Sequence, residues 1–367
     1  MWNQVPCREP GSVLVAIDAL SPPLPGGSTI RPQAATDDPA AQFARASSAE
    51  PRTLALVPPP AQAAEPRLAA GEAAASRRPI GVQARTLLRA CRPRQWTKNL
   101  LVLAAPCAAG VIDRPAIAAE VAGAFVVMCL ISSATYLLND VRDRGQDRLH
   151  PRKRTRPVAA GELSTRAALT AAVVFALLGL AIGAAIAPGL AAVALLYLLL
   201  TVSYSLWWRR VVVVDILVIS AGFVLRALAG GVATDIYLSR WFVLVTGFGA
   251  IFLVAAKRLA ELREQGESVP LRTTLRSYSR SGLTLLVAGS ASAATVAYIL
   301  WAVTRPSHLV WYSLSVVPFA LWLARYASLI ASGAGQAPEE LILRDRLLLA
   351  LSVLWAVLFL GGVYVHH

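Results

Sequence analysis

The chain has 367 residues, of which 56% are hydrophobic and only 15% are charged. Such a composition is too apolar for a soluble protein of this length, so we predict an integral membrane protein. The formal net charge of +14 does not indicate a nucleic-acid partner, because no DNA- or RNA-binding motif accompanies it, and it is better explained by cytoplasmic loops and by phosphorylated substrates or anionic lipid.

Residues 1–85 differ from the rest of the chain because they are rich in Ala, Pro, Ser and Gly and show little apolar periodicity. We predict a disordered cytoplasmic tail here, since such a segment cannot bury enough apolar surface to fold. Its short apolar run at 13–17 is broken by Asp18 and lacks the length of a signal-peptide core. The predicted catalytic domain is the membrane region that follows, residues 88–367.

Nine apolar stretches follow the tail, each about long enough to cross a bilayer, and they predict an all-α membrane domain. They cover residues 99–113, 117–138, 165–187, 189–207, 211–233, 241–259, 283–303, 309–331 and 346–365. Lysines and arginines gather in the loops on the side of the N-terminus, whereas the other loops hold little beyond Arg114, Arg240 and Arg305. By the positive-inside rule, the N-terminus and the charged loops lie in the cytoplasm and the C-terminus lies outside.

An acidic motif directly follows the second span and is the strongest functional signal in the chain. If the helix continues through it, Asp140, Asp143 and Asp147 lie three and four residues apart and project from one face, beside Asn139. Carboxylates this close repel one another unless a cation neutralises them. Hard oxygen ligands suit Mg²⁺ that also holds the phosphates of a substrate.

A basic run at 150–157 follows the acidic motif and contains Arg152 and Arg156. Guanidinium groups bind phosphate oxygens well, so an acidic cluster followed by a basic one indicates a metal-bridged diphosphate. A solvated loop that only sets membrane topology would have a similar composition. The clustering of one Asn and three Asp residues at the membrane exit of a helix favours the functional interpretation.

Further polar side chains lie inside or at the ends of spans, where charges are costly and usually face a cavity or a partner. Arg226 is the deepest, and either a salt bridge to an acid or a contact with substrate would explain it. Lys257 and Glu261 are one helical turn apart at the end of the sixth span, where Lys257 and Arg258 are candidate phosphate ligands. Tyr204 lies one to two turns inside the fourth span and could place its hydroxyl in a cavity.

Cysteine and histidine give no sign of catalysis or metal binding. The four cysteines form no Cys-x-x-Cys pair, which argues against a zinc site and against a disulfide framework. The four histidines are scattered along the chain, so we expect no histidine-based catalysis.

The chain resembles the UbiA superfamily of intramembrane prenyltransferases over about residues 88–365. The resemblance rests on Asn139-Asp140-x-x-Asp143-x-x-x-Asp147, followed by Arg152, Arg156-Pro157 and Gly161, which is similar to the first aspartate-rich motif of the family. It implies a ring of nine transmembrane helices around a central cavity, in agreement with the nine spans expected from hydropathy.

Within the superfamily the chain resembles the decaprenyl-phosphate phosphoribosyltransferase branch. Aromatic prenyltransferases carry a second motif, Asp-x-x-x-Asp, where this chain has Lys257 to Glu261, and segments 92–99 and 214–231 are similar to that branch. The resemblance implies a multi-pass enzyme of the cell (inner) membrane that transfers 5-phosphoribosyl from phosphoribosyl diphosphate to a polyprenyl (decaprenyl) phosphate, with Mg²⁺ as cofactor. Diphosphate would be released, and the product would serve arabinose donors for cell-wall arabinan.

On this resemblance we predict roles for individual residues. Mg²⁺ would be held by the catalytic aspartates together with the amide beside them: Asn139, Asp140, Asp143 and Asp147. The remaining phosphates would be bound by Lys98, Arg152, Arg156, Lys257 and Arg258. Further substrate contacts are expected from Asn99, Tyr136, Tyr204, Arg226 and Glu261. No general base is predicted, because the phosphate of the acceptor is already anionic near neutral pH. The protein has only to align the two substrates and neutralise their charge.

Two alternatives stay open on the sequence alone. A prenyltransferase of the same superfamily would move a prenyl group from prenyl diphosphate to an aromatic or other small acceptor. A transporter of a phosphorylated solute could also use acidic and basic residues in a nine-span bundle, although the polar groups here gather at one face. The sequence also leaves open the prenyl chain length and whether the protein forms homo-oligomers.

Overall fold

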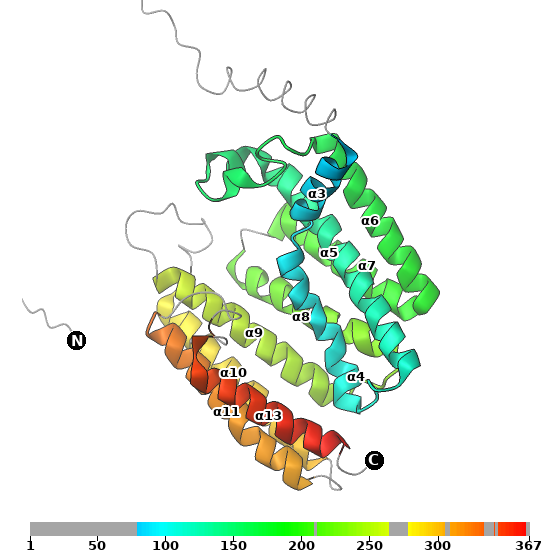
Figure 1. Cartoon of the computed structure of the whole chain (residues 1–367). Helices are drawn as coiled ribbons and strands as arrows, with labels where there is room; N and C mark the ends of the chain where they lie inside the picture. The colour runs from blue at the N-terminus through cyan, green and yellow to red at the C-terminus, as the bar shows by residue number, and fades with distance from the viewer. Residues whose placement is uncertain are drawn as a thin grey trace, which may run out of the picture. The chain divides into compact units, whose positions relative to one another are not determined.

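The computed structural model describes residues 79–208, 211–263, 278–304, 309–333, 341 and 344–364, and every regular element in these residues is a helix (Figure 1). In chain order the helices are α3 (Ile80–Ala90), η1 (Pro93–Leu103), α4 (Ala104–Ala109), α5 (Pro115–Leu149), η2 (Lys153–Thr155), α6 (Thr165–Ile186), α7 (Pro188–Ser203), η3 (Tyr204–Trp208), α8 (Val212–Ala233), α9 (Arg240–Arg263), α10 (Arg280–Val303), α11 (Leu309–Ala331) and α13 (Arg346–Tyr364). They all lie within one unit of the chain, Pro60–His367. The all-α prediction is confirmed for these residues. The tail as far as residue 78, Arg305 and three of the four histidines lie outside them.

Eight of the described helices are long and apolar enough to cross a membrane, which makes the chain a multi-pass membrane protein. They correspond to the second to ninth predicted spans. The first predicted span, 99–113, consists instead of the 3₁₀ helix η1 and the short α-helix α4. Pro106 in α4 has no N–H to donate to the preceding turn, close to the point where the helix changes type. The predicted number of nine spans is therefore not confirmed.

Helix α3 corrects the predicted boundary of the tail, because it begins at Ile80, inside the range 1–85 predicted to be disordered. Its Leu87 packs with Trp96 in a cluster that also involves α5 and α6, and tertiary packing of this kind stabilises a helix too short to be stable alone. Between α3 and η1 the chain turns at Arg92, whose φ of 55° places a non-glycine residue in the left-handed region ahead of Pro93.

Helix α5 carries the acidic motif out of the membrane. It begins with Pro115 at its first position and runs for 35 residues to Leu149. At a rise of about 1.5 Å per residue, its length of roughly 50 Å exceeds the ~30 Å hydrocarbon core of a bilayer. Part of the helix must therefore lie outside the hydrocarbon core, and the charged last turns are the part that suits water. The helix continues through Asn139 to Asp147, as the predicted acidic face requires.

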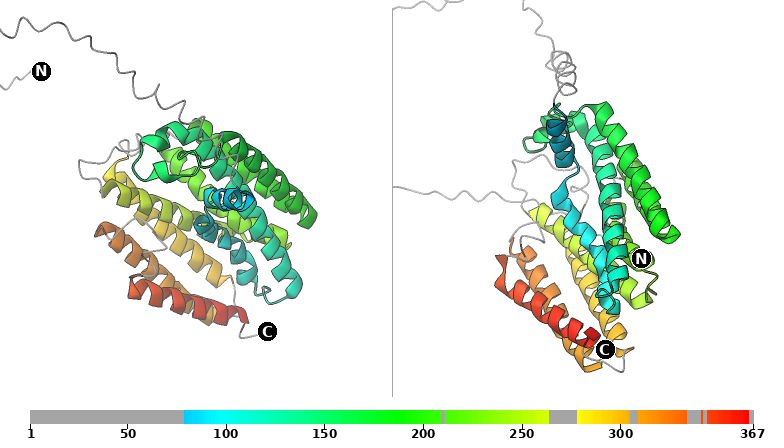
Figure 2. Two further views of the ribbon diagram at one scale, coloured as in Figure 1. Left: turned by 45° about the horizontal axis from the view of Figure 1, so that its top comes forward. Right: turned by 45° about the vertical axis from the view of Figure 1, so that its right-hand side comes forward.

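Consecutive long helices pack against one another from α5 to α13 (Figures 1 and 2). The last helix, α13, also contacts α4, so the beginning and the end of the membrane domain meet. One apolar core lies among η1, α5, α7 and α8, and a second lies among α8 to α13. Because η1 packs on both α5 and α8, it lies between the two helices that carry the acidic motif and the deepest arginine.

The contact between η1 and α8 depends on Gly230. A Cβ atom at this position would lie 1.7 Å from the carbonyl oxygen of Val102, so only glycine permits the observed approach. One turn earlier on α8 is Arg226, which this approach brings within hydrogen-bonding reach of Asn99 on η1. Helix packing thereby sets up the deepest polar contact of the domain.

Candidate active site

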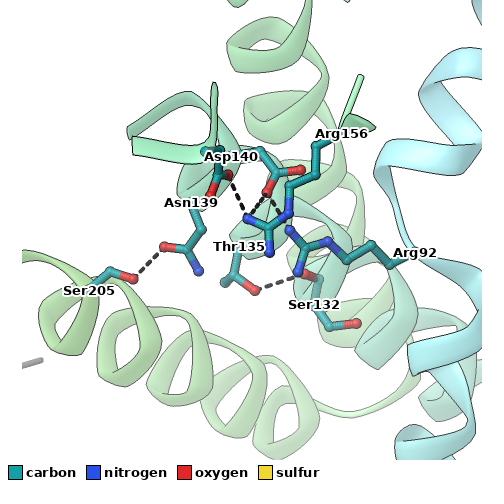
Figure 3. A network of polar contacts seen from close by, with 8 residues as sticks. Arg92, Ser132, Thr135, Asn139, Asp140, Arg156 and Ser205 are labelled. Carbon is teal, nitrogen blue, oxygen red and sulfur yellow. Dashed lines mark hydrogen bonds and ion pairs between the residues drawn. The ribbon is translucent and has the colours of Figure 1, made fainter. Parts of the chain in front are cut away.

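The carboxylates at the end of α5 are paired with arginines from two other segments (Figure 3). Asp140 and Asp147 are buried, with 1% and 2% of their surface exposed. Asp140 forms ion pairs with Arg92 and, at 3.3 Å, with Arg156, whose Nη1 also lies 2.6 Å from Asp147 Oδ2. Because both aspartates share Arg156, they lie on one face of α5, as the spacing predicts. We call these four residues the Asp140 network.

The position of Arg92 follows from the backbone turn between α3 and η1. Its guanidinium carbon lies 5.2 Å from the centre of the Tyr136 ring, one turn before Asp140 on α5. A cation over an aromatic face is stabilised by the ring quadrupole, so Tyr136 helps to hold the guanidinium beside the carboxylate. Non-glycine residues in the left-handed region cost energy and cluster at functional centres.

The acidic face retains an oxygen that suits a metal ion. Asp140 Oδ2 is buried and has no hydrogen-bond partner among the described residues, which is costly for a charged oxygen. The neighbouring Asn139 accepts a hydrogen bond from Ser205 on η3. In the described ranges no three His, Cys, Asp or Glu side chains are grouped as metal ligands, and Arg156 bridges Asp140 and Asp147 instead. The donor atoms on this face are hard oxygens, and such a set fits Mg²⁺.

Arg226 is 5% exposed, and in the described part of the chain its partners are neutral groups. Nε donates to Asn99 Oδ1 at 2.8 Å, Nη2 to the Tyr197 hydroxyl at 2.6 Å and Nη1 to the Gly222 carbonyl at 2.8 Å. Asp215, the acid on the same helix, pairs with another arginine. A buried cation without a carboxylate partner needs an anion from elsewhere, which favours substrate contact over a structural salt bridge. We call this the Arg226 network.

Arg258 lies at the centre of a third polar group, the Arg258 network, formed mainly by α8 and α9. Arg258 is 5% exposed, and it binds Asp215 at 2.7 Å and Glu261 at 2.6 Å. The hydroxyls of Tyr204 and Tyr278 also donate to Asp215. Burial raises the pKa of Tyr278, which keeps its hydroxyl protonated as a donor. Two carboxylates already match the charge of Arg258, an arrangement that favours a structural role over the predicted phosphate contact.

The three networks form one continuous polar region. Helix α5 joins the first two, because Asn99 of the Arg226 network donates to Ser132, one turn before the Tyr136 ring that lies under Arg92. Two neighbouring residues of η3 join the Asp140 network to the Arg258 network. Ser205 donates to Asn139, the residue beside Asp140, and Tyr204 donates to Asp215. The polar residues predicted from separate spans are therefore brought together.

Four predicted site residues remain outside the contacts described above. Lys98 on η1 and Asp143 on α5 are half-buried. Arg152 and Lys257 are exposed, and within the described residues neither belongs to any of the three networks. Their side chains are therefore accessible to a ligand.

The predicted site residues leave out several members of this region, among them Arg92, Tyr197, Asp215 and Tyr278. For Arg92 the available signal was a cation directly before a proline at the membrane entrance. The two tyrosines carry no comparable signal, because their roles arise from which helices pack together.

Residues 100–351 match the UbiA prenyltransferase family. A decaprenyl-phosphate phosphoribosyltransferase from Corynebacterium glutamicum is 41% identical over 312 residues, which cover 82% of this chain and 93% of that protein. A protein of the same name from Mycobacterium tuberculosis is 43% identical over 275 residues, covering 73% of this chain and 91% of that protein.

A similar fold is found among solved structures. A UbiA homologue from Archaeoglobus fulgidus bound to DMAPP and Mg²⁺ matches with a TM-score of 0.58 at 18% identity, covering 76% of this chain and 98% of that chain. At this identity the likeness concerns the fold alone. Taken with the sequence match across the spans and the acidic motif, it leads to one conclusion: the chain belongs to the UbiA prenyltransferase family.

Proposed function

We propose that this chain transfers a 5-phosphoribosyl group from phosphoribosyl diphosphate to decaprenyl phosphate and releases diphosphate. The observation that carries the proposal is the identity of 41% and 43% to two decaprenyl-phosphate phosphoribosyltransferases over more than nine-tenths of their length. The site supports it, because buried carboxylates stand beside several cations at the projecting end of α5. Use of the product for arabinose donors of the cell wall is part of the same proposal.

The donor would be held by its phosphates. Arg92 and Arg156 now neutralise aspartates and are 29% and 26% exposed, so they could exchange carboxylate for phosphate oxygens. The remaining positive charges around the donor phosphates would come from Lys98, Arg152 and Lys257. We assign Lys257 to the 5-phosphate, because it is exposed on α9 and its charge is not matched within the three networks.

Mg²⁺ is the proposed cofactor, and Asp140 Oδ2 with Asn139, Asp143 and Asp147 would hold it. When bound, it would neutralise the charge that develops on diphosphate as the C1–O bond breaks. The acceptor phosphate is the nucleophile. Arg226, whose partners in the described residues are neutral, would bind this phosphate through its positive charge. The protein's residues thus align two anions and require no general base.

We also propose that the active site faces the cytoplasm and that the C-terminus lies outside. The acidic motif, η2 and the charged end of α9 all follow spans that would end on the same side. This distribution agrees with the positive-inside rule.

The test is mass analysis of the lipid made by detergent-solubilised protein from phosphoribosyl diphosphate and decaprenyl phosphate. We expect a phosphoribosylated lipid and one diphosphate per turnover. Transfer only from prenyl diphosphate to an aromatic acid would instead identify a prenyltransferase. A protein that shows neither transfer nor diphosphate release, but moves a phosphorylated solute across the membrane of vesicles, would be identified as a transporter.

Removing divalent metal is expected to stop transfer. Treatment with a chelator followed by gel filtration should abolish turnover, and Mg²⁺ should restore it, because the buried carboxylates need a cation to accept a diphosphate. Binding of Mn²⁺, followed by electron paramagnetic resonance, gives a readout that does not depend on turnover. Full activity in chelator would exclude the metal.

Replacing Lys257 by Asp is expected to raise the KM for phosphoribosyl diphosphate by roughly tenfold or more. Charge-assisted contacts are worth about 1.5–3 kcal/mol, and the new carboxylate adds repulsion. The KM for decaprenyl phosphate should change much less. Arg166→Asp, at an exposed position in the first turn of α6, controls for the general effect of reversing a charge. A folded Lys257→Asp protein with unchanged donor affinity would remove Lys257 from the 5-phosphate site.

A further inference from the structure

We propose that Tyr197 on α7 is a positioning residue for the acceptor phosphate, because it fixes the guanidinium of Arg226 in the orientation that receives this anion. The inference rests on the proposed function, which assigns the acceptor phosphate to Arg226, and it adds the residue that prepares Arg226 for binding. Tyr197 is 4% exposed, and its hydroxyl is engaged with Arg226. Its role is therefore exerted through the arginine.

Tyr197 restrains Arg226 in two ways. Its hydroxyl accepts a hydrogen bond from Arg226 Nη2 at 2.6 Å. The centre of its ring lies 4.7 Å from the guanidinium carbon, closer than the ring of Phe223 at 5.7 Å. The hydrogen bond restrains one nitrogen, and the aromatic face restrains the plane of the whole group. Because both contacts come from one side chain on a neighbouring helix, they fix the guanidinium more firmly than either would alone.

The contacts of Arg226 leave donors for an anion. A guanidinium has five N–H groups. Among the described residues three of them have acceptors: Nε–H donates to Asn99, one N–H of Nη1 to the Gly222 carbonyl and one N–H of Nη2 to Tyr197. Each terminal nitrogen therefore keeps one N–H. A phosphate can accept two hydrogen bonds from one guanidinium, so the remaining donors match one phosphate group.

Asn99 supplies a second restraint on Arg226. Its Nδ2 donates to Cys129 Sγ and to Ser132 Oγ on α5, both at 3.2 Å. These bonds determine which end of the amide faces the arginine, so that Oδ1 accepts from Nε at 2.8 Å. Both N–H groups of the Asn99 amide are thus engaged with the protein, and the residue is fully buried. We assign Asn99 the same indirect role as Tyr197.

A purely structural role for Arg226 would call for different partners. A structural cation buried in a membrane domain is normally paired with a carboxylate, as Arg258 is with Asp215 and Glu261. The partners of Arg226 in the described part of the chain are an amide, a hydroxyl and a backbone carbonyl, which leave its charge unmatched. An arginine that is held in place without being neutralised is preorganised for an anion, because its orientation is set before the ligand arrives.

The affinity for farnesyl phosphate, with farnesol as its uncharged analogue, tests this role without turnover. Tyr197→Phe keeps the ring and removes the hydroxyl. In detergent-solubilised protein we expect the Kd for farnesyl phosphate to rise roughly tenfold and the Kd for farnesol to stay within about twofold of the parent. Tyr298→Phe is the matched control, because Tyr298 is also 4% exposed and its hydroxyl is hydrogen-bonded to Ser315, outside the three networks.

Kinetics with the full substrates give a second readout. In Tyr197→Phe the KM for decaprenyl phosphate should rise by a similar factor, while the KM for phosphoribosyl diphosphate stays within about twofold of the parent. A structural role would move neither KM and would lower the melting temperature alone, as we expect for Tyr298→Phe. That outcome, or a rise in the donor KM in place of the acceptor KM, would overturn the proposal.

A fluorine label gives a readout that does not depend on how well Tyr197→Phe folds. Incorporation of 3-fluorotyrosine at position 197 keeps the ring and the hydroxyl of the parent. Its fluorine resonance should shift when farnesyl phosphate is added and not when farnesol is added. The same response to both compounds, or to neither, would contradict the positioning role.

The two proposals fail separately. Protein that binds farnesyl phosphate in a manner dependent on Tyr197, but makes no phosphoribosylated lipid, keeps the positioning role and loses the proposed function. Active protein whose acceptor KM is unchanged in Tyr197→Phe loses the positioning role alone.

Discussion

Replacing Asp140 by Asn is expected to remove most turnover while the protein still folds. The side chain is buried and forms ion pairs with Arg92 and Arg156. Its Oδ2 atom has no hydrogen-bond partner in the described residues. Asparagine keeps the shape but loses the charge that would hold a metal against the donor diphosphate. Losing one group that stabilises developing charge typically costs about 10²–10³ in kcat, and we expect a fall of that size.

The measurement is the initial rate at saturating substrates, together with the affinity for Mn²⁺. Both should fall in Asp140→Asn, whereas the elution volume in detergent should stay that of the parent. Glu162→Gln is the matched control, since Glu162 also pairs with an arginine, Arg89, but at an exposed position. Exposed ion pairs contribute roughly 0–1 kcal/mol, so the control should keep its activity. If Asp140→Asn kept a rate within about threefold of the parent, a barrier change of roughly 0.7 kcal/mol, a metal-bridging role for Asp140 would be untenable.

The acidic face could be predicted from sequence because its residues are on one helix. Spacing within a helix fixes which side chains share a face, and the shared contact of Asp140 and Asp147 with Arg156 agrees with it. The partner Arg92 is 48 residues earlier, and its arrival at Asp140 depends on a left-handed turn and on packing of η1 against α5. The spacing of residues along the sequence does not predict that these two distant segments pack together.

The first span shows the corresponding limit of hydropathy. An apolar run predicts burial in the membrane but not the type of helix, so the 3₁₀ geometry of η1 was not foreseen. The predicted tail, 1–85, overlaps the first turns of α3 for a related reason. A short amphipathic helix contains too few apolar residues to stand out beside an Ala- and Pro-rich tail, and its stability comes from packing in a cluster with distant residues of α5 such as Leu137.

Arg258 shows how two adjacent basic residues can be assigned different roles only after folding. In sequence Lys257 and Arg258 are equivalent candidates for a phosphate. In the structure Lys257 is exposed, whereas Arg258 is enclosed by Asp215 of α8 and Glu261 of its own helix. The Arg258 side chain is 7% exposed, and those of its two acids are 4% and 17% exposed. We therefore infer that Arg258 links the ends of α8 and α9 and positions the site without touching the donor.

Arg258→Met is accordingly expected to destabilise the protein rather than to weaken donor binding. Removing one partner of a buried ion pair leaves charges uncompensated and costs about 3–5 kcal/mol. The melting temperature in detergent should fall clearly, and the active fraction with it, while the KM for phosphoribosyl diphosphate of the folded protein stays near that of the parent. Arg258→Met combined with Asp215→Asn and Glu261→Gln removes the whole charge set and should recover part of the lost stability, since no buried charge is then left uncompensated. A single variant as stable as the parent, but with a donor KM raised as in Lys257→Asp, would show that Arg258 binds phosphate and would return it to the role that the sequence suggested.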